Sequence, residues 1–182
     1  FVFYIDELLL ALGSLAGTGL IFTMPNADTD GRIVMQKIKE FCDKNTHAKV
    51  FESLGQQRYL SCIQHTDGVV GNSSSGLLEA PALNTGTINI GDRQKGRLKA
   101  SSVIDCKPER DEILSAIDQL FSDNFQSSLK MIENPYGHGG ATERICGILE
   151  KKSLDNILKK SFYAVYSYHC YTSCSFVCRF NA

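Results

Sequence analysis

The chain has 182 residues, of which 43% are hydrophobic, and its 19 lysines and arginines nearly balance its 20 aspartates and glutamates. This length predicts one compact domain, and a net charge of −1 gives no electrostatic reason to expect nucleic acid or an anionic membrane as a partner. No apolar run reaches the roughly 20 residues of a membrane-spanning helix, and the first apolar run lacks the flanks of a signal peptide. Because the chain begins at Phe1 rather than Met, we expect a segment or processed product of a longer protein.

The chain begins with a helical pattern and then alternates two kinds of segment. Residues 5–15 predict an entry helix within the first 17 residues. Short apolar runs rich in β-branched and aromatic residues follow, each closed within a few residues by Pro, Gly, Asn or Asp; they lie at 18–24, 48–52, 68–71, 87–90 and 102–105. Such runs are typical of strands that are buried on both faces of a parallel sheet.

Helical patterns accompany these runs at residues 30–44, 56–65, 108–121 and 140–151. The first places Ile33 and Val34 on its inward stripe, with capping residues at 28–30, and the third opens with Pro108 in its first turn and continues its stripe to Phe121. Strands that alternate with helices predict a three-layer α/β domain with a parallel sheet and right-handed crossovers, which we place at residues 1–160.

The seven cysteines fall into two groups. Four stand singly among mostly apolar neighbours and are expected to be buried free thiols: Cys42, Cys62, Cys106 and Cys146. Cys170, Cys174 and Cys178, beside His169, have a spacing that suits one metal-binding helix face. Residues 161–182, however, carry seven of the 17 aromatic residues and a single charge, so we favour an atypical aromatic and cysteine-rich tail and expect no metal site.

A serine loop, residues 71–76, directly follows the third apolar run. The hydroxyls of Ser73, Ser74 and Ser75, the glycines at both ends and the start of a helix are what an anion-binding turn needs. Glu79, one turn later, is placed to accept the two hydroxyls of a ribose. The alternative is an ordinary serine-capped loop with a glutamate in the first turn of its helix.

Two further loops lie at the predicted carboxyl edge of the sheet, where ligands bind in open α/β folds. Residues 89–99 carry four cations on a glycine-punctuated loop, including Arg93 and Arg97, and guanidinium groups fork onto phosphate oxygens. Residues 134–141 form a glycine-rich turn in which Tyr136 or His138 is a candidate ligand contact. The alternative for residues 89–99 is a solvated basic loop without a ligand, and the alternative for the glycine-rich turn is a histidine that faces solvent.

The glycine fingerprints of dinucleotide and P-loop sites and the serine elbow of hydrolases are absent from the sequence.

Four segments in the same order resemble the hydrolysing UDP-N-acetylglucosamine 2-epimerases of bacterial sialic-acid pathways. They are residues 19–28, 70–76 with Glu79, 88–94 with Gly96 and Arg97, and 134–137, and the resemblance spans about residues 8–160. It implies a cytoplasmic enzyme of glycosyltransferase-B architecture, in which two Rossmann-like domains face a cleft and the C-terminal one holds the nucleotide. The resemblance also implies that the present chain corresponds to that C-terminal half.

The resemblance also assigns roles to residues. Ser73 and Ser74 would bind the diphosphate, Glu79 the ribose, Arg93 the phosphates, and Asn26 would lie near the nucleotide. Further contacts would come from residues in the same loops: Ser75, Gly76, Arg97, Tyr136 and His138. The family reaction converts UDP-N-acetylglucosamine and water to N-acetylmannosamine and UDP without a cofactor.

The catalytic acids and bases of this family lie mainly on the missing N-terminal domain, so we expect a UDP-sugar-binding half with little or no turnover. A homo-oligomer formed through the face left open by that domain is a further expectation. Two alternatives remain at this point: the donor-binding domain of a glycosyltransferase of the same architecture, which an acceptor-dependent transfer assay distinguishes, and a non-enzymatic sugar-nucleotide-binding fragment.

Overall fold

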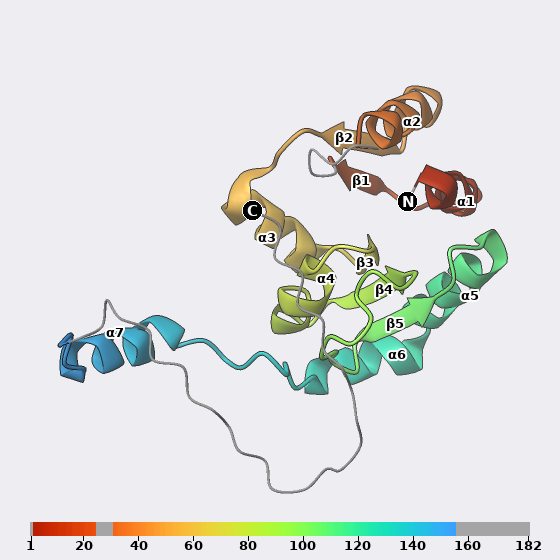
Figure 1. The fold of residues 1–182 in the computed structure, drawn as a ribbon. Helices are drawn as coiled ribbons and strands as arrows, with labels where there is room; N and C mark the ends of the chain where they lie inside the picture. The colour runs from red at the N-terminus through yellow and green to blue at the C-terminus, as the bar shows by residue number, and fades with distance from the viewer. Residues whose placement is uncertain (1, 25–30, 156–182) are drawn as a thin grey trace, which may run out of the picture. The chain divides into compact units, whose positions relative to one another are not determined.

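The computed structural model describes residues 2–24 and 31–155 and contains two compact units, Phe1–Gly139 and Gly140–Ala182 (Figure 1). Among the described residues, the first unit holds every strand and most of the helices. Within the described residues, no helix is long and apolar enough to cross a membrane. The predicted boundary between residues 160 and 161, the whole tail after it and Asn26 lie outside the described residues.

The first unit alternates strands and helices as the sequence predicts. Its strands are β1 (Leu20–Thr23), β2 (Ala48–Phe51), β3 (Gly68–Gly71), β4 (Gly86–Ile90) and β5 (Val103–Cys106). Its helices are α1 (Val2–Gly13), α2 (Gly31–Lys44), α3 (Gly55–His65), α4 (Ser75–Leu78), α5 (Arg110–Phe121) and α6 (Asp123–Ser128). Two 3₁₀ turns, Pro81–Leu83 and Leu129–Met131, complete it. The α/β class and the parallel strand direction are confirmed.

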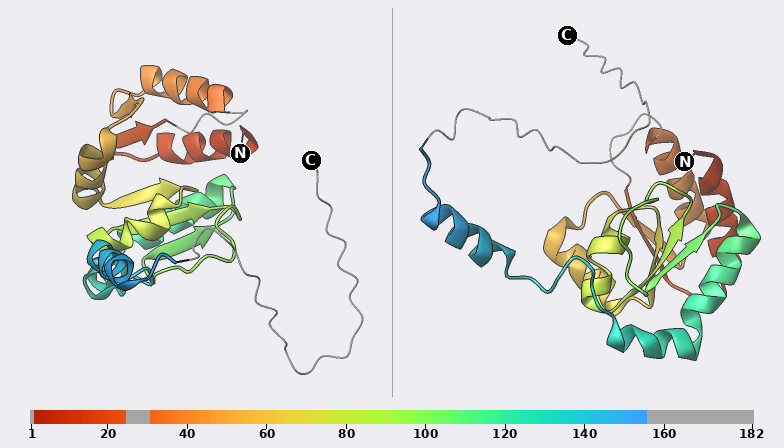
Figure 2. Two further views of the ribbon diagram at one scale, coloured as in Figure 1. Left: turned by 60° about the vertical axis from the view of Figure 1, so that its left-hand side comes forward. Right: turned by 60° about the horizontal axis from the view of Figure 1, so that its bottom comes forward.

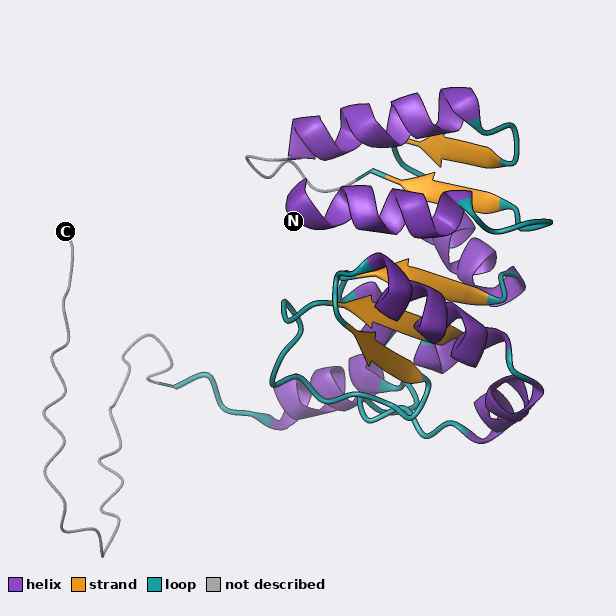
Figure 3. Cartoon of the chain, turned by 90° about the vertical axis from the view of Figure 1, so that its right-hand side faces the viewer, coloured by secondary structure: helices purple, strands orange, loops and turns teal. Residues whose placement is uncertain are grey.

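The five strands form two parallel sheets (Figure 3). β1 pairs with β2, Leu20 opposite Ala48, in a two-stranded sheet. β4 lies between β3 and β5 in a three-stranded sheet, with Ile88 opposite Val70 on one side and Ile104 on the other. The sequence predicts one sheet, and the structure differs from that prediction because β1 and β3 do not pair with each other.

Helices cover both faces of the strands, which gives the predicted three layers (Figure 2). α1, α2 and α5 lie on one face, and α3 and α4 lie on the other. Lys37 of α2 forms an ion pair with Asp6 of α1 at 2.6 Å, and Glu7 of α1 accepts a hydrogen bond from the backbone N–H of Arg110 at 3.0 Å. One core joins these helices to β4 and β5 and includes Ile5, Leu8, Leu12, Val34, Ile38, Ile88, Ile104, Ile113, Ile117 and Leu120.

Three details of the helix predictions are wrong. Ile33 is 48% exposed, because the inward stripe of α2 is centred on Val34 and Ile38, about 100° further round the helix. Phe121, the last residue of α5, is half exposed beside a cavity between the sheets. Pro108 precedes α5, whose N-cap is Glu109. The caps expected at residues 28–30 lie outside the described residues.

The second unit contains α7 (Ala141–Lys151), which agrees with the helix expected at 140–151. Its apolar side chains Ile145, Ile148 and Leu149 are exposed.

The single cysteines are free thiols, but their expected burial is wrong in degree. Cys42, Cys62 and Cys106 are half-buried, and Cys146 is exposed. Burial, with the nearby carboxylates of Glu112 and Asp105, raises the pKa of the Cys106 thiol to about 11. The thiol therefore stays protonated at neutral pH and is a poor nucleophile.

Candidate nucleotide-binding site

The serine loop and the basic loop leave adjacent strands at the carboxyl edge of the three-stranded sheet. β3 ends at Gly71, the first residue of the serine loop (residues 71–76), and this loop runs into the start of α4. β4 ends at Ile90, and the basic loop (residues 89–99) begins with the last two residues of this strand. Because β3 and β4 are parallel neighbours, the two loops emerge side by side. α4 is a single turn of four residues, so its dipole adds little, and anion binding here depends on hydroxyls, amides and side-chain cations.

The three serines of the loop have different surroundings. Ser73 is exposed, and its Oγ accepts a hydrogen bond from the N–H of Ser75 at 3.3 Å, which leaves its hydroxyl proton free to be donated. Ser74 precedes α4 without a side-chain capping bond. Ser75 is buried, and its Oγ accepts a hydrogen bond from the Tyr59 hydroxyl of α3 at 2.8 Å. Ser75 thus connects the loop to α3, and Ser73 is the serine that faces outward.

Gly76 allows close packing between α4 and β4. It is buried against β4, and its carbonyl accepts a hydrogen bond from the Thr87 hydroxyl at 2.9 Å. A Cβ on Gly76 would lie 2.5 Å from Cγ2 of Thr87. The glycine therefore allows α4 to lie directly on the sheet.

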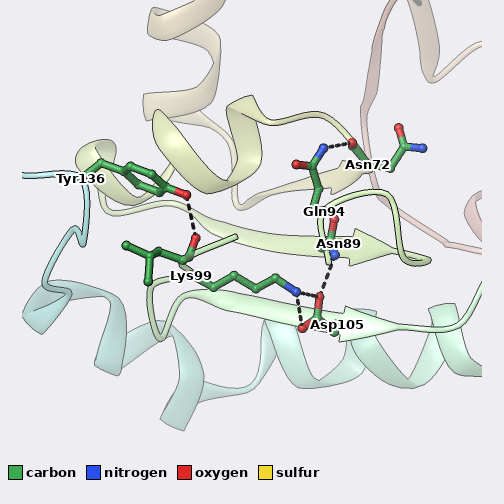
Figure 4. Close-up of polar contacts among 7 residues, drawn as sticks. Asn72, Asn89, Gln94, Lys99, Asp105 and Tyr136 are labelled. Carbon is green, nitrogen blue, oxygen red and sulfur yellow. Dashed lines mark hydrogen bonds and ion pairs between the residues drawn. The ribbon is translucent and has the colours of Figure 1, made fainter. Parts of the chain in front are cut away.

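Gln94 joins the two loops (Figure 4). It is 3% exposed, and its Nε2 donates a hydrogen bond to the backbone carbonyl of Asn72 at 2.7 Å. Gly91 begins the basic loop with φ +75°, a conformation that favours glycine. The loop folds back on itself through a hydrogen bond from Lys95 N–H to Asp92 O at 2.8 Å. This geometry presents the exposed Arg93 beside the serine loop.

One cavity is bordered by residues of both loops. Asn72, Ser73, Gly76 and Arg93 all line it. Ser74 and Glu79 do not, and Glu79 is exposed at the end of α4. Ser73 and Arg93 therefore border the same cavity, where a hydroxyl and a guanidinium group suit a phosphate, whereas the predicted ribose-binding carboxylate of Glu79 is not among the residues that line it.

The segment that contains Tyr136 is hydrogen-bonded to the basic loop and to the end of α4. The Tyr136 hydroxyl donates a hydrogen bond to the carbonyl of Leu98 in the basic loop at 2.9 Å (Figure 4). Asn134 Oδ1 accepts from the Tyr136 N–H at 3.0 Å, and its Nδ2 donates to the carbonyl of Leu78 at 3.4 Å. Tyr136 thus has a structural partner for its hydroxyl. His138 and Arg97 are exposed.

A charged network lies beneath the basic loop (Figure 4). Lys99 Nζ contacts both carboxylate oxygens of Asp105, at 2.6 and 2.8 Å, and the amide of Asn89, 1% exposed, donates to the same carboxylate at 2.6 Å. Burial alone would raise the pKa of Asp105, but the hydrogen bonds from Lys99 and Asn89 and the charge of Lys99 together lower it. The ionised carboxylate fixes the return of the loop into β5. No cluster of metal-ligating side chains occurs among the residues the structure describes.

Replacing Gln94 with alanine is expected to lower the free energy of unfolding by about 1 kcal/mol, because the Asn72 carbonyl loses its hydrogen-bond donor. Urea denaturation followed by circular dichroism measures the change. The matched control is Gln64→Ala, at an exposed position of α3, which should alter stability by less than about 0.5 kcal/mol. Equal losses in the two variants would contradict a joining role for Gln94.

Most of this chain matches known proteins in sequence. A family model described as UDP-N-acetylglucosamine 2-epimerase matches residues 3–150. The chain belongs to that family. It is 42% identical over 160 residues to the hydrolysing GDP/UDP-N,N'-diacetylbacillosamine 2-epimerase of Campylobacter jejuni, a match covering 87% of this chain and 41% of that protein. It is 43% identical over 133 residues to the polysialic acid biosynthesis protein P7 of Escherichia coli, covering 72% of this chain and 34% of that protein.

Solved epimerase structures share the fold of this family member. The Neisseria meningitidis UDP-GlcNAc 2-epimerase bound to UDP-GlcNAc matches with a TM-score of 0.62 and 18% identity, over 82% of this chain and 40% of that one. The Methanocaldococcus jannaschii enzyme in complex with UDP-GlcNAc and UDP matches with a TM-score of 0.63 and 18% identity, over 82% and 41%. The chain thus spans about two fifths of the length of these relatives.

Proposed function

We propose that this chain is the UDP-sugar-binding half of a hydrolysing UDP-N-acetylglucosamine 2-epimerase and that it has little or no turnover alone. The observation that carries the proposal is the shared cavity, which Ser73 and Arg93 line from two loops held together by Gln94. Membership of the epimerase family favours this function over that of a glycosyltransferase donor domain. The proposal includes a cytoplasmic location and a second domain of the same enzyme as the partner.

The chemistry of the loops suits a diphosphate that becomes a leaving group. In the proposed reaction a base removes the C2 proton of the sugar, the C1–O bond breaks to give a C1–C2 double bond, and UDP departs as an anion; water then adds to the resulting glycal. Donors placed on the phosphates stabilise the charge that develops on UDP. Ser73 has a hydroxyl proton to donate, and the Arg93 guanidinium can fork onto two phosphate oxygens. We assign Ser74 to the same phosphates and Glu79 to the ribose. The assignment of Glu79 requires that the nucleotide extend from the cavity to the exposed carboxyl end of α4.

Arg93→Ala is expected to weaken UDP binding by about tenfold or more, because a charge-assisted hydrogen-bond pair to phosphate contributes about 1.5–3 kcal/mol. Ser73→Ala is expected to weaken binding by about tenfold, the effect at the low end for a single hydrogen bond to a charged group. Isothermal titration calorimetry of the 182-residue chain with UDP and with UDP-N-acetylglucosamine measures both.

Two exposed positions at the opposite edge of the sheets provide matched controls. Lys44→Ala removes a cation at the end of α2, and Ser101→Ala removes a hydroxyl in the turn before β5. Both should leave UDP affinity unchanged. If Arg93→Ala and Ser73→Ala behave like these controls, the assigned site is wrong, and release of N-acetylmannosamine by the isolated chain would disprove its inactivity.

A further inference from the structure

The side-chain amide of Gln94 has one paired and one unpaired end. It is 3% exposed, and its Nε2 donates a hydrogen bond to the backbone carbonyl of Asn72 at 2.7 Å. Its Oε1 points away from Asn72 and is buried without a hydrogen-bond donor among the residues that the structure describes (Figure 4). A buried amide oxygen without a donor costs free energy, so stability alone does not explain a glutamine at this position.

The backbone around Gln94 is held in a fixed turn. The N–H of Lys95 donates to Asp92 O at 2.8 Å, and the N–H of Arg97 donates to Gln94 O at 3.2 Å. Within this turn Arg93 is exposed and lines the cavity, whereas the side chain of Gln94 is buried and is not among the residues that line it. Two successive residues of the basic loop therefore have different surroundings: the first borders the cavity, and the second holds the serine loop.

The hydrogen bond from Gln94 fixes the direction of the peptide between Asn72 and Ser73. In a planar trans peptide the C=O and the N–H point in opposite directions. Because the Asn72 carbonyl points at Gln94, the N–H of Ser73 points away from Gln94. Within the described part of the chain this N–H has no hydrogen-bond acceptor, and Ser73 itself lines the cavity.

The other hydrogen bonds of the serine loop leave this peptide free to turn. The N–H of Ser75 donates to Ser73 Oγ at 3.3 Å, and the N–H of Gly76 donates to Ser73 O at 3.3 Å. These bonds hold the side chain and the carbonyl of Ser73, and neither involves the peptide that precedes it. If that peptide turned over, the Asn72 carbonyl would replace the Ser73 N–H, and a carbonyl cannot donate to a phosphate. The bond from Gln94 therefore keeps a donor at this position.

We propose that Gln94 is a positioning residue for the diphosphate of the ligand, because its amide locks the Asn72–Ser73 peptide so that the Ser73 N–H donates to a phosphate oxygen in the cavity. The basic loop then contributes to phosphate binding twice, through the guanidinium of Arg93 and through the peptide that Gln94 holds. A donor that is fixed before the ligand arrives needs no rearrangement when charge develops on the phosphate. This role rests on the proposed function, since it requires a phosphate group in the cavity.

The variant that tests this role is Gln94→Met, which nearly conserves the volume of the side chain and removes both polar atoms of the amide. Its urea midpoint should fall no further than that of Gln94→Ala, so the chain stays folded while the peptide is free to turn. The affinity for UDP then falls with the fraction of molecules that keep the Ser73 N–H in place, and we expect a loss of about threefold to tenfold. Isothermal titration calorimetry with UDP and with inorganic pyrophosphate measures the loss. Gln64→Met, at an exposed position of α3, is the matched control and should bind like the native chain.

NMR of the backbone amides gives two further measurements, the first of which needs no variant. In the native chain the amide proton of Ser73 should move downfield when UDP or pyrophosphate binds, because its N–H becomes bonded to an anion. The N–H of Ser75, already bonded to Ser73 Oγ, should move less. In the free Gln94→Met chain the residual dipolar coupling of the Ser73 N–H should change, because this bond samples two directions, while that of Ser75 stays the same. A residue that only stabilised the fold would leave the direction of the Ser73 N–H unchanged.

The outcomes separate the role of Gln94 from the function of the site. If the native chain binds neither UDP nor pyrophosphate, the proposed function is wrong, and the role of Gln94 is wrong with it. If the native chain binds both but Gln94→Met loses less than twofold in affinity, or Ser73 shows no downfield shift, the proposed function stands and the role of Gln94 is wrong. A loss for UDP without a loss for pyrophosphate would also overturn this role, because Gln94 would then act on the uridine rather than on the phosphates.

Discussion

Replacing Ile88 with alanine is expected to lower the free energy of unfolding by about 2–5 kcal/mol. Ile88 is 0% exposed at the centre of β4, where β3 and β5 flank it, and it belongs to the core that joins the strands to α1 and α5. Removing three carbons from this position leaves a cavity that a strand paired on both sides cannot close. Urea denaturation followed by circular dichroism measures the loss. If the free energy of unfolding depends on urea concentration with the same slope in both proteins, the two unfold in the same transition.

The matched control is the same substitution in the other sheet. Ile21 lies at the middle of β1 and is 51% exposed, so Ile21→Ala should cost less than about 1 kcal/mol. Equal losses at the two positions would contradict the difference in burial between them.

The positions of the strands were predictable from sequence, but their division into two sheets was not. Runs of β-branched residues closed by turn-forming residues place all five strands to within two residues of their observed ends. Such a run records that a strand is apolar on both faces and carries no information about which neighbour it has. β1 therefore has the sequence of an inner strand although one of its edges is unpaired.

The helix α6 was missed for a physical reason. Its sequence, DNFQSS, has no apolar stripe, and what defines its start is a capping bond in which Ser122 Oγ accepts from the N–H of Phe125 at 3.3 Å. A capping serine alone is too common to predict a helix. α7 shows the reverse case, because its apolar repeat predicts the helix correctly but does not reveal that Ile145 and Ile148 are exposed.

The loops of the candidate site were predictable because strand ends of a parallel sheet gather at one edge, but the connections between them were not. Gln94 lies between two cationic residues that are exposed, whereas its own side chain is buried. Nothing in the local sequence pattern indicates this difference. The hydrogen bond from the Tyr136 hydroxyl to the carbonyl of Leu98 likewise has no local sequence signal. The Gln94–Asn72 and Tyr136–Leu98 hydrogen bonds join residues 22 and 38 positions apart in the chain. They form only when α4 and the loops pack together, and no sequence motif with a fixed spacing indicates that packing.

Replacing Gly76 with alanine is expected to lower the free energy of unfolding by about 1–3 kcal/mol and to displace the serine loop. The new Cβ would lie 2.5 Å from Cγ2 of Thr87. Thr87 cannot turn aside, because it is β-branched, 2% exposed and held by the hydrogen bond from its hydroxyl to the Gly76 carbonyl at 2.9 Å. The strain is instead relieved by lifting α4 from β4, which also moves Ser73 away from Arg93. Urea denaturation and UDP calorimetry measure the two effects.

The second variant that tests this explanation is Thr87→Ser, which removes Cγ2 and keeps the hydroxyl that bonds to Gly76. If the clash is with this methyl group, Gly76→Ala should cost much less in the Thr87→Ser background than in the native chain, with an interaction energy of about 1 kcal/mol or more in the double-mutant cycle. Additive losses would show that Gly76 is required for another reason, such as the backbone conformation of the loop. Recovery of stability together with UDP affinity would show that the packing of α4 on β4 positions the loop that we assign to the diphosphate.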